Sequence, residues 1–157
     1  MKHKVCSTIL ALFITFIVQA QQPKEYILLG EITVDSLRND TSCKWFNAPP
    51  PYTPCEAFTG KLAAVADKLF VKIYCGSWCE DTQRELPRFI KVAEATGLKY
   101  SLYFLDRNKQ SPDGAEKKDT ILFIPTFILM KDGIEVGRVV ESAPYGIEKH
   151  LADLLKK

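Results

Sequence analysis

Cysteines are the side chains of this chain best suited to covalent chemistry, and two of the five lie in one short segment. Cys75 and Cys79 fall within Tyr74–Pro87, which reads YCGSWCEDTQRELP. Gly76 and Ser77 interrupt a strand there, and the helical pattern that follows places Cys79 at or near the first turn of a helix. Unpaired N–H groups and the positive end of the helix dipole favour a thiolate at such a position. Because the thiolate is the nucleophile in thiol–disulfide exchange, Cys79 is predicted to be a reactive thiol.

The elements expected around this motif alternate between strands and helices. Apolar periodicity predicts strands at 70–75, 100–105, 126–130 and 135–141, and helices at 56–69, 80–95 and 147–155. A strand–helix–strand unit implies a right-handed parallel crossover, and a hairpin turn at 131–133 adds antiparallel strands to the same sheet. The expected fold class is therefore α/β, with a mixed central sheet flanked by helices on both faces.

The N-terminal part of the chain is less regular. Tyr26 to Leu37 is apolar and β-branched, so we expect one strand, or two short ones around Gly30. The segment 38–54 contains Pro49, Pro50, Pro51 and Pro54 and is expected to be a loop.

The order of these motifs resembles that of the thioredoxin-like superfamily. Trp78-Cys79 is similar to the Trp-Cys pair that opens the family's Trp-Cys-x-x-Cys site, and Pro87 to the proline within its active-site helix. Ile124-Pro125-Thr126-Phe127 is similar to the family's Ile-Pro-Thr segment, in which the proline is cis and lies against the active cysteine. The matches run in family order from about residue 62 to residue 155, and the likeness is greatest to secreted or periplasmic proteins of Bacteroidetes-type bacteria.

The resemblance implies thiol–disulfide exchange on protein or small-molecule thiols. Cys79 would be the nucleophile, Trp78 would shield the site, and cis Pro125 would present the backbone of Ile124 to an extended substrate. The resemblance implies no bound cofactor. The recycling partner would be an external reductant or a glutathione-like thiol.

One departure from the family pattern leaves three alternatives open. Thr82 stands where the family has its second cysteine, and Ile73 stands where the family commonly has a buried acid. In the first alternative Cys79 works alone, with the Thr82 hydroxyl donating a hydrogen bond to the thiolate. In the second, Cys75 is its disulfide partner, which requires Cα atoms within roughly 7 Å. In the third, the chain is a non-catalytic binding or interaction module of the cell envelope, because a fold does not guarantee its usual activity.

Cys43 and Cys55 form a separate pair that encloses eleven residues. We favour a structural disulfide between them, which would contribute about 3 kcal/mol by loop entropy. Four cysteines allow three pairings, and the alternative is that Cys55 simply begins the helix after Pro54. A metal site is not expected, because His150 is the one histidine beyond the first twenty residues and the chain has no Cys-x-x-Cys pair.

Composition and charge narrow the class of protein. The 157 residues are 46% hydrophobic and 25% charged, which is typical of one globular domain. The net charge of +2 is due to Lys2 and Lys4, because the remainder of the chain has 19 basic and 19 acidic residues. Nucleic acid is therefore not expected as a partner, since no basic excess is left to build a binding face.

The first twenty residues have the pattern of a secretory signal. A short basic segment precedes the fourteen uncharged residues 5–18, and Ala20 is suited to signal-peptidase cleavage. Fourteen residues fall short of the roughly 20 that span a bilayer, so no membrane span is expected after cleavage. We predict a signal peptide at 1–20, an N-terminal extension and loop at 21–55, and the thioredoxin-like domain at 56–157. The even number of remaining cysteines agrees with a periplasmic or secreted location.

Overall fold

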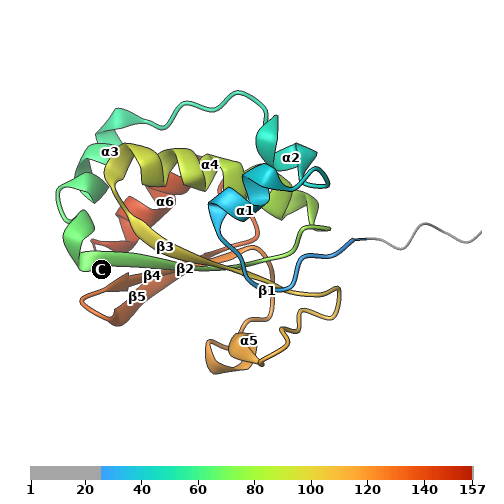
Figure 1. The fold of residues 1–157 in the computed structure, drawn as a ribbon. Coiled ribbons are helices and arrows are strands. Elements are labelled where there is room, and N and C mark those ends of the chain that lie inside the picture. The colour runs from blue at the N-terminus through green and yellow to red at the C-terminus, as the bar shows by residue number, and fades with distance from the viewer. Residues whose placement is uncertain (1–25, 157) are drawn as a thin grey trace, which may run out of the picture.

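The computed structural model describes residues 26–156, which are built around one five-stranded mixed sheet (Figure 1). The predicted signal peptide lies outside the described residues. In chain order the elements are β1 (Gly30–Glu31), α1 (Val34–Asn39), α2 (Lys44–Asn47), α3 (Glu56–Ala63), a 3₁₀ turn (Ala66–Lys68), β2 (Leu69–Cys75), α4 (Glu80–Thr96), β3 (Lys99–Phe104), α5 (Ala115–Lys118), β4 (Thr126–Lys131), β5 (Ile134–Val140) and α6 (Ile147–Leu154). The strand order is β1-β3-β2-β4-β5, in which β2 and β3 are parallel and the other neighbouring pairs are antiparallel.

The β2–α4–β3 unit positions the cysteine motif, and the sequence predicted its three elements to within a residue or two. Apolar side chains of α4 recur at helical spacing, and Leu86 and Phe89 are fully buried. The helix ends at Gly97, whose left-handed conformation (φ 73°) allows its N–H to donate to the carbonyl of Ala93. The parallel pairing of β2 with β3 confirms the predicted crossover.

Two unequal layers cover the sheet. Figure 1 shows α1, α2, α3, α4 and α6 on one face and α5 with its flanking loops on the other. The main core lies under the five helices and includes Val71, Phe89, Phe127, Leu129 and Ile147, all of them buried. The molecule thus has the expected α/β fold with a mixed sheet and helices on both faces, although the four residues of α5 are the whole helical cover of the second face in the described chain.

The expected strand at 26–37 is wrong over most of its length. β1 has two residues, and the chain then enters α1 because the Thr33 hydroxyl caps that helix by accepting the Ser36 N–H at 3.1 Å. The expected loop at 38–54 contains the short helix α2. The helix expected at 56–69 ends at Ala63 in the structure. Leu69, which was expected to be its last residue, is the first residue of β2.

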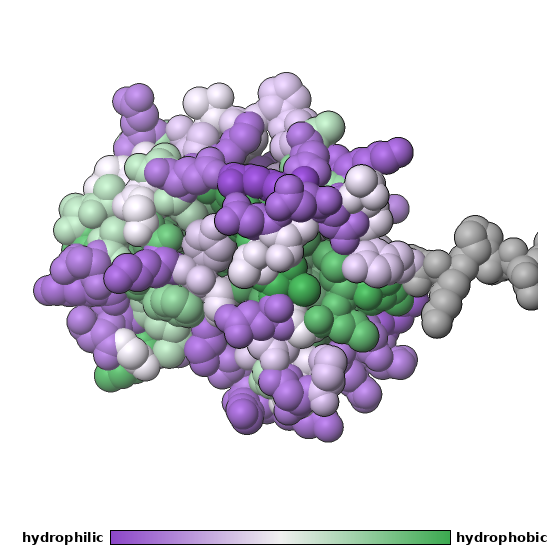
Figure 2. All heavy atoms as spheres, in the orientation of Figure 1, coloured by the Kyte–Doolittle hydropathy of each residue, from purple (hydrophilic) through white to green (hydrophobic). Residues whose placement is uncertain are grey.

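Polar side chains cover most of the face seen in Figure 2, and apolar side chains gather beside the point where the described chain begins. Tyr26 and Leu29, in that first segment, are exposed. None of the helices within residues 26–156 has the length and apolar character needed to cross a membrane.

Candidate functional site

The tight turn between β2 and α4 places Cys79 just beyond the carboxyl end of β2, the central strand of the sheet. The Cys79 N–H donates to the carbonyl of Gly76 at 3.0 Å, and Cys79 is the N-cap residue of α4. Its thiol is partly exposed and donates to the carbonyl oxygen of Ile124, 45 positions away, at an S···O distance of 3.6 Å. The Ile124–Pro125 peptide bond is cis. The structure therefore brings together Cys79, Ile124 and Pro125, which the sequence assigned to one site.

Trp78, the residue before Cys79, is held in place by two contacts. Its indole N–H donates to the carbonyl of Leu105 at 3.2 Å, and the guanidinium carbon of Arg107 lies 5.1 Å from the centroid of its ring. Trp78 and Cys79 both pack against a small apolar cluster on the face of the sheet that carries α5; its buried members are Tyr74, Leu105, Ile121, Ile124 and Ile128. The indole N–H is thus held by Leu105, the residue that follows β3, and the face of the ring is covered by the Arg107 guanidinium.

Gly76 allows the close packing of this turn. A Cβ atom at this position would lie 2.9 Å from Cδ1 of Ile124 and 3.0 Å from two atoms of the Trp78 ring. Real Cβ atoms essentially never come within 3.0 Å of another heavy atom, and contacts at 3.0 Å are tighter than nine in ten of those observed. The absence of a side chain at Gly76 therefore lets the indole and the Ile124 side chain meet beside Cys79.

Side chains at the start of α4 hold the turn in place. Thr82 is fully buried, and its hydroxyl accepts the Gly76 N–H at 3.2 Å. The Gln83 side-chain amide donates to the carbonyl of Ser77 at 2.8 Å, and the Ser77 hydroxyl accepts the N–H of Leu28 at 3.2 Å. Within the described chain the hydrogen bonds of Thr82 do not include the one expected to the Cys79 sulfur, so the observed role of Thr82 is to fix the turn.

Cys75 and Cys79 pack in different apolar clusters. The Cys75 side chain is fully buried in the core beneath the helices, and its thiol donates to the carbonyl of Tyr103 at 3.6 Å. Burial raises the pKa of the Cys75 thiol well above its usual value, and the nearby charge of Cys79 acts in the same direction. A thiol held protonated is a weak nucleophile, so these observations favour a structural role for Cys75. Its pairing with Cys79 stays a prediction.

Cys43 and Cys55 lie at the starts of two different helices. Cys43 is the buried N-cap residue of α2, where burial raises its pKa, whereas Cys55 is the exposed N-cap residue of α3. The four described cysteines are free in this structure, and the disulfide between Cys43 and Cys55 stays a prediction. Between residues 26 and 156 we find no group of three or more His, Cys, Asp or Glu side chains arranged to hold a metal ion.

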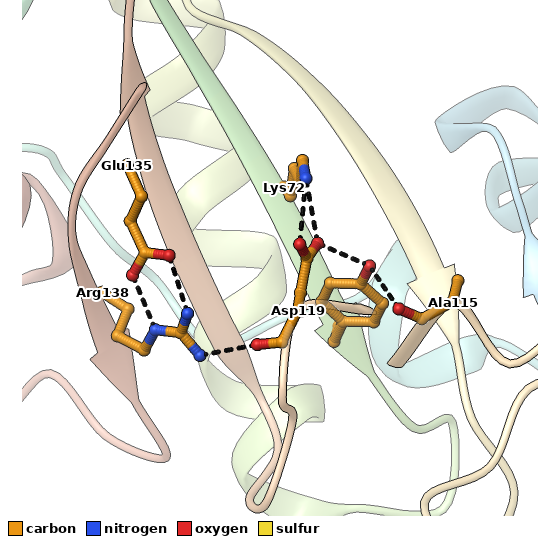
Figure 3. A network of polar contacts seen from close by, with 6 residues as sticks. Lys72, Ala115, Asp119, Glu135 and Arg138 are labelled. Atoms are coloured by element: carbon orange, nitrogen blue, oxygen red, sulfur yellow. Dashed lines mark hydrogen bonds and ion pairs between the residues drawn. The ribbon is translucent and has the colours of Figure 1, made fainter. Parts of the chain in front are cut away.

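A polar network anchors the loop that leads from β3 to the site (Figure 3). The Asp119 carboxylate accepts hydrogen bonds from Lys72 at 3.0 and 3.1 Å and from the Tyr74 hydroxyl at 2.8 Å, both on β2. The Asp119 carbonyl accepts a hydrogen bond from Arg138 on β5 at 3.0 Å. Burial opposes ionisation of Asp119, but the hydrogen bonds from Lys72 and Tyr74 outweigh it, so the pKa of Asp119 is lowered. The loop is thereby fixed to two strands five residues before Ile124.

Several of these contacts could not be found from the sequence. Leu105 and Arg107 belong to no motif, and they contact Trp78 because β3 ends beside the turn. Gln83 lies within the cysteine motif, but its residue type gave no sign of the hydrogen bond to Ser77. Asp119 lies in a polar loop where its residue type carries no signal, and its partners come from two separate strands.

Comparison with known proteins identifies relatives among the thioredoxins, although no family model matches the chain. Thioredoxin AMT13 of Alternaria alternata is 39% identical over 74 residues, which are 46% of this chain and 58% of that protein. Mitochondrial thioredoxin-3 of Saccharomyces cerevisiae is 32% identical over 89 residues, or 56% of this chain and 66% of that protein. The chain thus spans less than two thirds of the length of either relative.

Two solved structures can be compared with this fold. A protein of unknown function from Pseudomonas aeruginosa superposes with a TM-score of 0.52 at 14% identity, covering 81% of each chain. The oxidised form of mitochondrial thioredoxin 3 from Saccharomyces cerevisiae superposes with a TM-score of 0.44 at 25% identity, covering 60% of this chain and 88% of that one. With the sheet order, the crossover and the relatives described above, the chain is a protein of thioredoxin-like fold, similar in sequence to thioredoxins.

Proposed function

We propose that this protein catalyses thiol–disulfide exchange with Cys79 as its single nucleophile. The observation that carries the proposal is the position of this thiol, partly exposed at the N-cap of α4 and 3.6 Å from the carbonyl before cis Pro125. The sequence similarity to two thioredoxins supports the same chemistry.

The proposed reaction has two exchange steps. The Cys79 thiolate attacks one sulfur of a substrate disulfide, a new S–S bond forms to that sulfur, and the other sulfur leaves as a thiolate. An external thiolate, of the glutathione-like class, then attacks the mixed disulfide and releases Cys79 as a thiolate. Thr82 carries no thiol and its side chain is buried, so it cannot resolve the mixed disulfide from within. We therefore expect a long-lived adduct between Cys79 and substrate when no external thiol is present.

The proposal also covers how the substrate binds and where the protein acts. The backbone at Ile124 would pair with an extended substrate segment, because its carbonyl lies beside the attacking sulfur. The protein would act in the periplasm or outside the cell, as the basic and apolar pattern of residues 1–20 suggests.

The proposal is tested with a peptide whose one cysteine is capped as a mixed disulfide with thionitrobenzoate. The full chain is studied in a background with Cys6→Ser and Cys55→Ser, because Cys55 is the exposed cysteine among the described residues and Cys6 lies outside them. We expect one peptide adduct and one released thionitrobenzoate per protein molecule, and the same result when Cys75→Ser is introduced as a further substitution. The protein that carries Cys79→Ser as the further substitution should form no adduct. If the protein with Cys79 forms none while iodoacetamide still labels that thiol, the exchange proposal is wrong and a non-catalytic interaction module takes its place.

A further inference from the structure

A small hollow next to the segment that carries Ile124 and Pro125 is lined by exposed apolar side chains. Leu122, Phe123 and Val140 are 66%, 50% and 38% exposed, although large apolar residues are usually buried. With Thr120, Thr126 and Arg138 they surround a volume of about 120 Å³, which we call the apolar hollow. A cavity of about 150 Å³ can hold benzene, so the apolar hollow has the size of one large apolar side chain.

The apolar hollow lies on the face of the sheet that carries the small apolar cluster contacted by Cys79. Thr126 pairs with Tyr74 on β2 and with Val140 on β5, and directly paired residues carry their side chains on one face. Tyr74 belongs to the small apolar cluster against which Cys79 packs. Phe123 directly precedes Ile124, whose carbonyl oxygen contacts the thiol. A substrate chain attached to Cys79 would therefore pass close to the apolar hollow.

The walls of the apolar hollow are held in place without a ligand. The Thr126 hydroxyl donates to the carbonyl of Phe123 at 2.6 Å. Arg138 donates to Glu135 at 2.7 and 2.8 Å and to the Asp119 carbonyl at 3.0 Å (Figure 3). Because these contacts fix one wall at Phe123 and another at Arg138, little further ordering is needed when a ligand binds.

We propose that the apolar hollow binds a large apolar side chain of a polypeptide substrate, two residues from the cysteine that Cys79 attacks. This inference rests on the proposed function and names its substrate class. In an extended chain, residues two positions apart point to the same side and lie about 7 Å apart. A substrate cysteine directed at Cys79 thus places its second neighbour on the face that carries the apolar hollow. Substrates with leucine, methionine or phenylalanine at that position are preferred over those with alanine.

A binding experiment tests the inference without any redox step. The full chain with Cys79→Ser is titrated with extended peptides in which serine replaces the central cysteine, and the position two before or two after it is leucine or alanine. We expect a leucine peptide to bind about tenfold more tightly than its alanine counterpart in one of the two positions, as for a few methylene groups entering a pocket. Adding Leu122→Ala and Phe123→Ala should reduce this preference to less than about threefold.

Ile134→Ala is the matched control, because Ile134 is also an exposed apolar side chain, 71% exposed, but lies at the other end of β5. It should keep the leucine preference. Both altered side chains in the double variant are exposed, so its thermal unfolding should match that of the parent protein. Equal binding of leucine and alanine peptides at both positions, or a preference that survives the double substitution, overturns the inference.

A second measurement separates this inference from the proposed function. The rate of mixed-disulfide formation is measured for cysteine-containing versions of the same peptides, capped with thionitrobenzoate, on the protein with Cys79. A leucine preference of about tenfold in this rate supports both proposals. A leucine preference in binding with no reaction at Cys79 overturns the exchange proposal alone. Reaction at Cys79 with no leucine preference in either assay overturns the apolar hollow alone.

Discussion

A methyl group added at Gly76 tests how tightly the turn beside Cys79 is packed. In Gly76→Ala the new Cβ would lie 2.9 Å from Cδ1 of Ile124 and 3.0 Å from the Trp78 ring. Neither neighbour can move freely, because Ile124 is 5% exposed and the Trp78 indole is held by its hydrogen bond to Leu105. Overpacking of this kind typically costs about 1 to 3 kcal/mol, so we expect the free energy of unfolding to fall by that amount.

Gly60→Ala is the matched control for the same substitution. Gly60 lies within α3, is exposed, and its added Cβ would meet no heavy atom within 4 Å. Replacing glycine by alanine within a helix stabilises a protein by about 0.5 to 1 kcal/mol. The two alanine variants should therefore change stability in opposite directions, although each adds one methyl group.

Urea unfolding at fixed pH measures both changes in stability. If the slope of the unfolding free energy against urea concentration is the same in each variant, the substitution has changed stability without changing the surface exposed on unfolding. We also expect Gly76→Ala to slow mixed-disulfide formation at Cys79, because displacement of Ile124 moves the carbonyl that contacts the thiol. If Gly76→Ala is as stable as the parent protein, or more stable, the turn accommodates a side chain without cost and the packing argument is refuted.

Three further predictions concern buried or partly buried groups. Thr82→Val removes the acceptor of the Gly76 N–H and should cost about 1 to 3 kcal/mol in urea unfolding, whereas Thr82→Ser, which keeps the hydroxyl, should cost less; equal losses would contradict this account. The pKa of Asp119 is lowered from 3.8 in the folded state, so its carboxylate stabilises the protein above that pH and the stabilisation is lost as the pH falls below it. Asp119→Asn should therefore flatten the acid side of the stability profile, measured by urea unfolding between about pH 2 and pH 6; parallel profiles would refute the assignment. The buried thiols of Cys43 and Cys75 should react with iodoacetamide only when the protein unfolds, as peptide mass mapping at about pH 8 can follow; rapid labelling of either thiol in the native protein would disprove its burial.

Local signals explain which elements were predictable. The β2–α4–β3 unit combines an apolar strand, a periodic helix with a glycine stop at Gly97 and a second apolar strand, and each signal acts within a few residues. The strand expected at 26–37 failed because β-branched residues favour a strand only when a neighbouring strand pairs with them. Glu31 is the last residue of β1, and the Thr33 cap then starts a helix.

The sequence by itself determined which groups are available for chemistry and where each lies along the chain. Cys79 stands at a strand–helix junction with no thiol at Thr82, and both facts follow from neighbouring residues. Only the tertiary structure decided what these groups contact. It placed the Cys75 side chain in the core beneath the helices, Cys79 against the small apolar cluster, and the carbonyl of Ile124 against the sulfur of Cys79. Those outcomes depend on strand order and register, which arise from packing between distant segments and leave no periodic pattern in the chain.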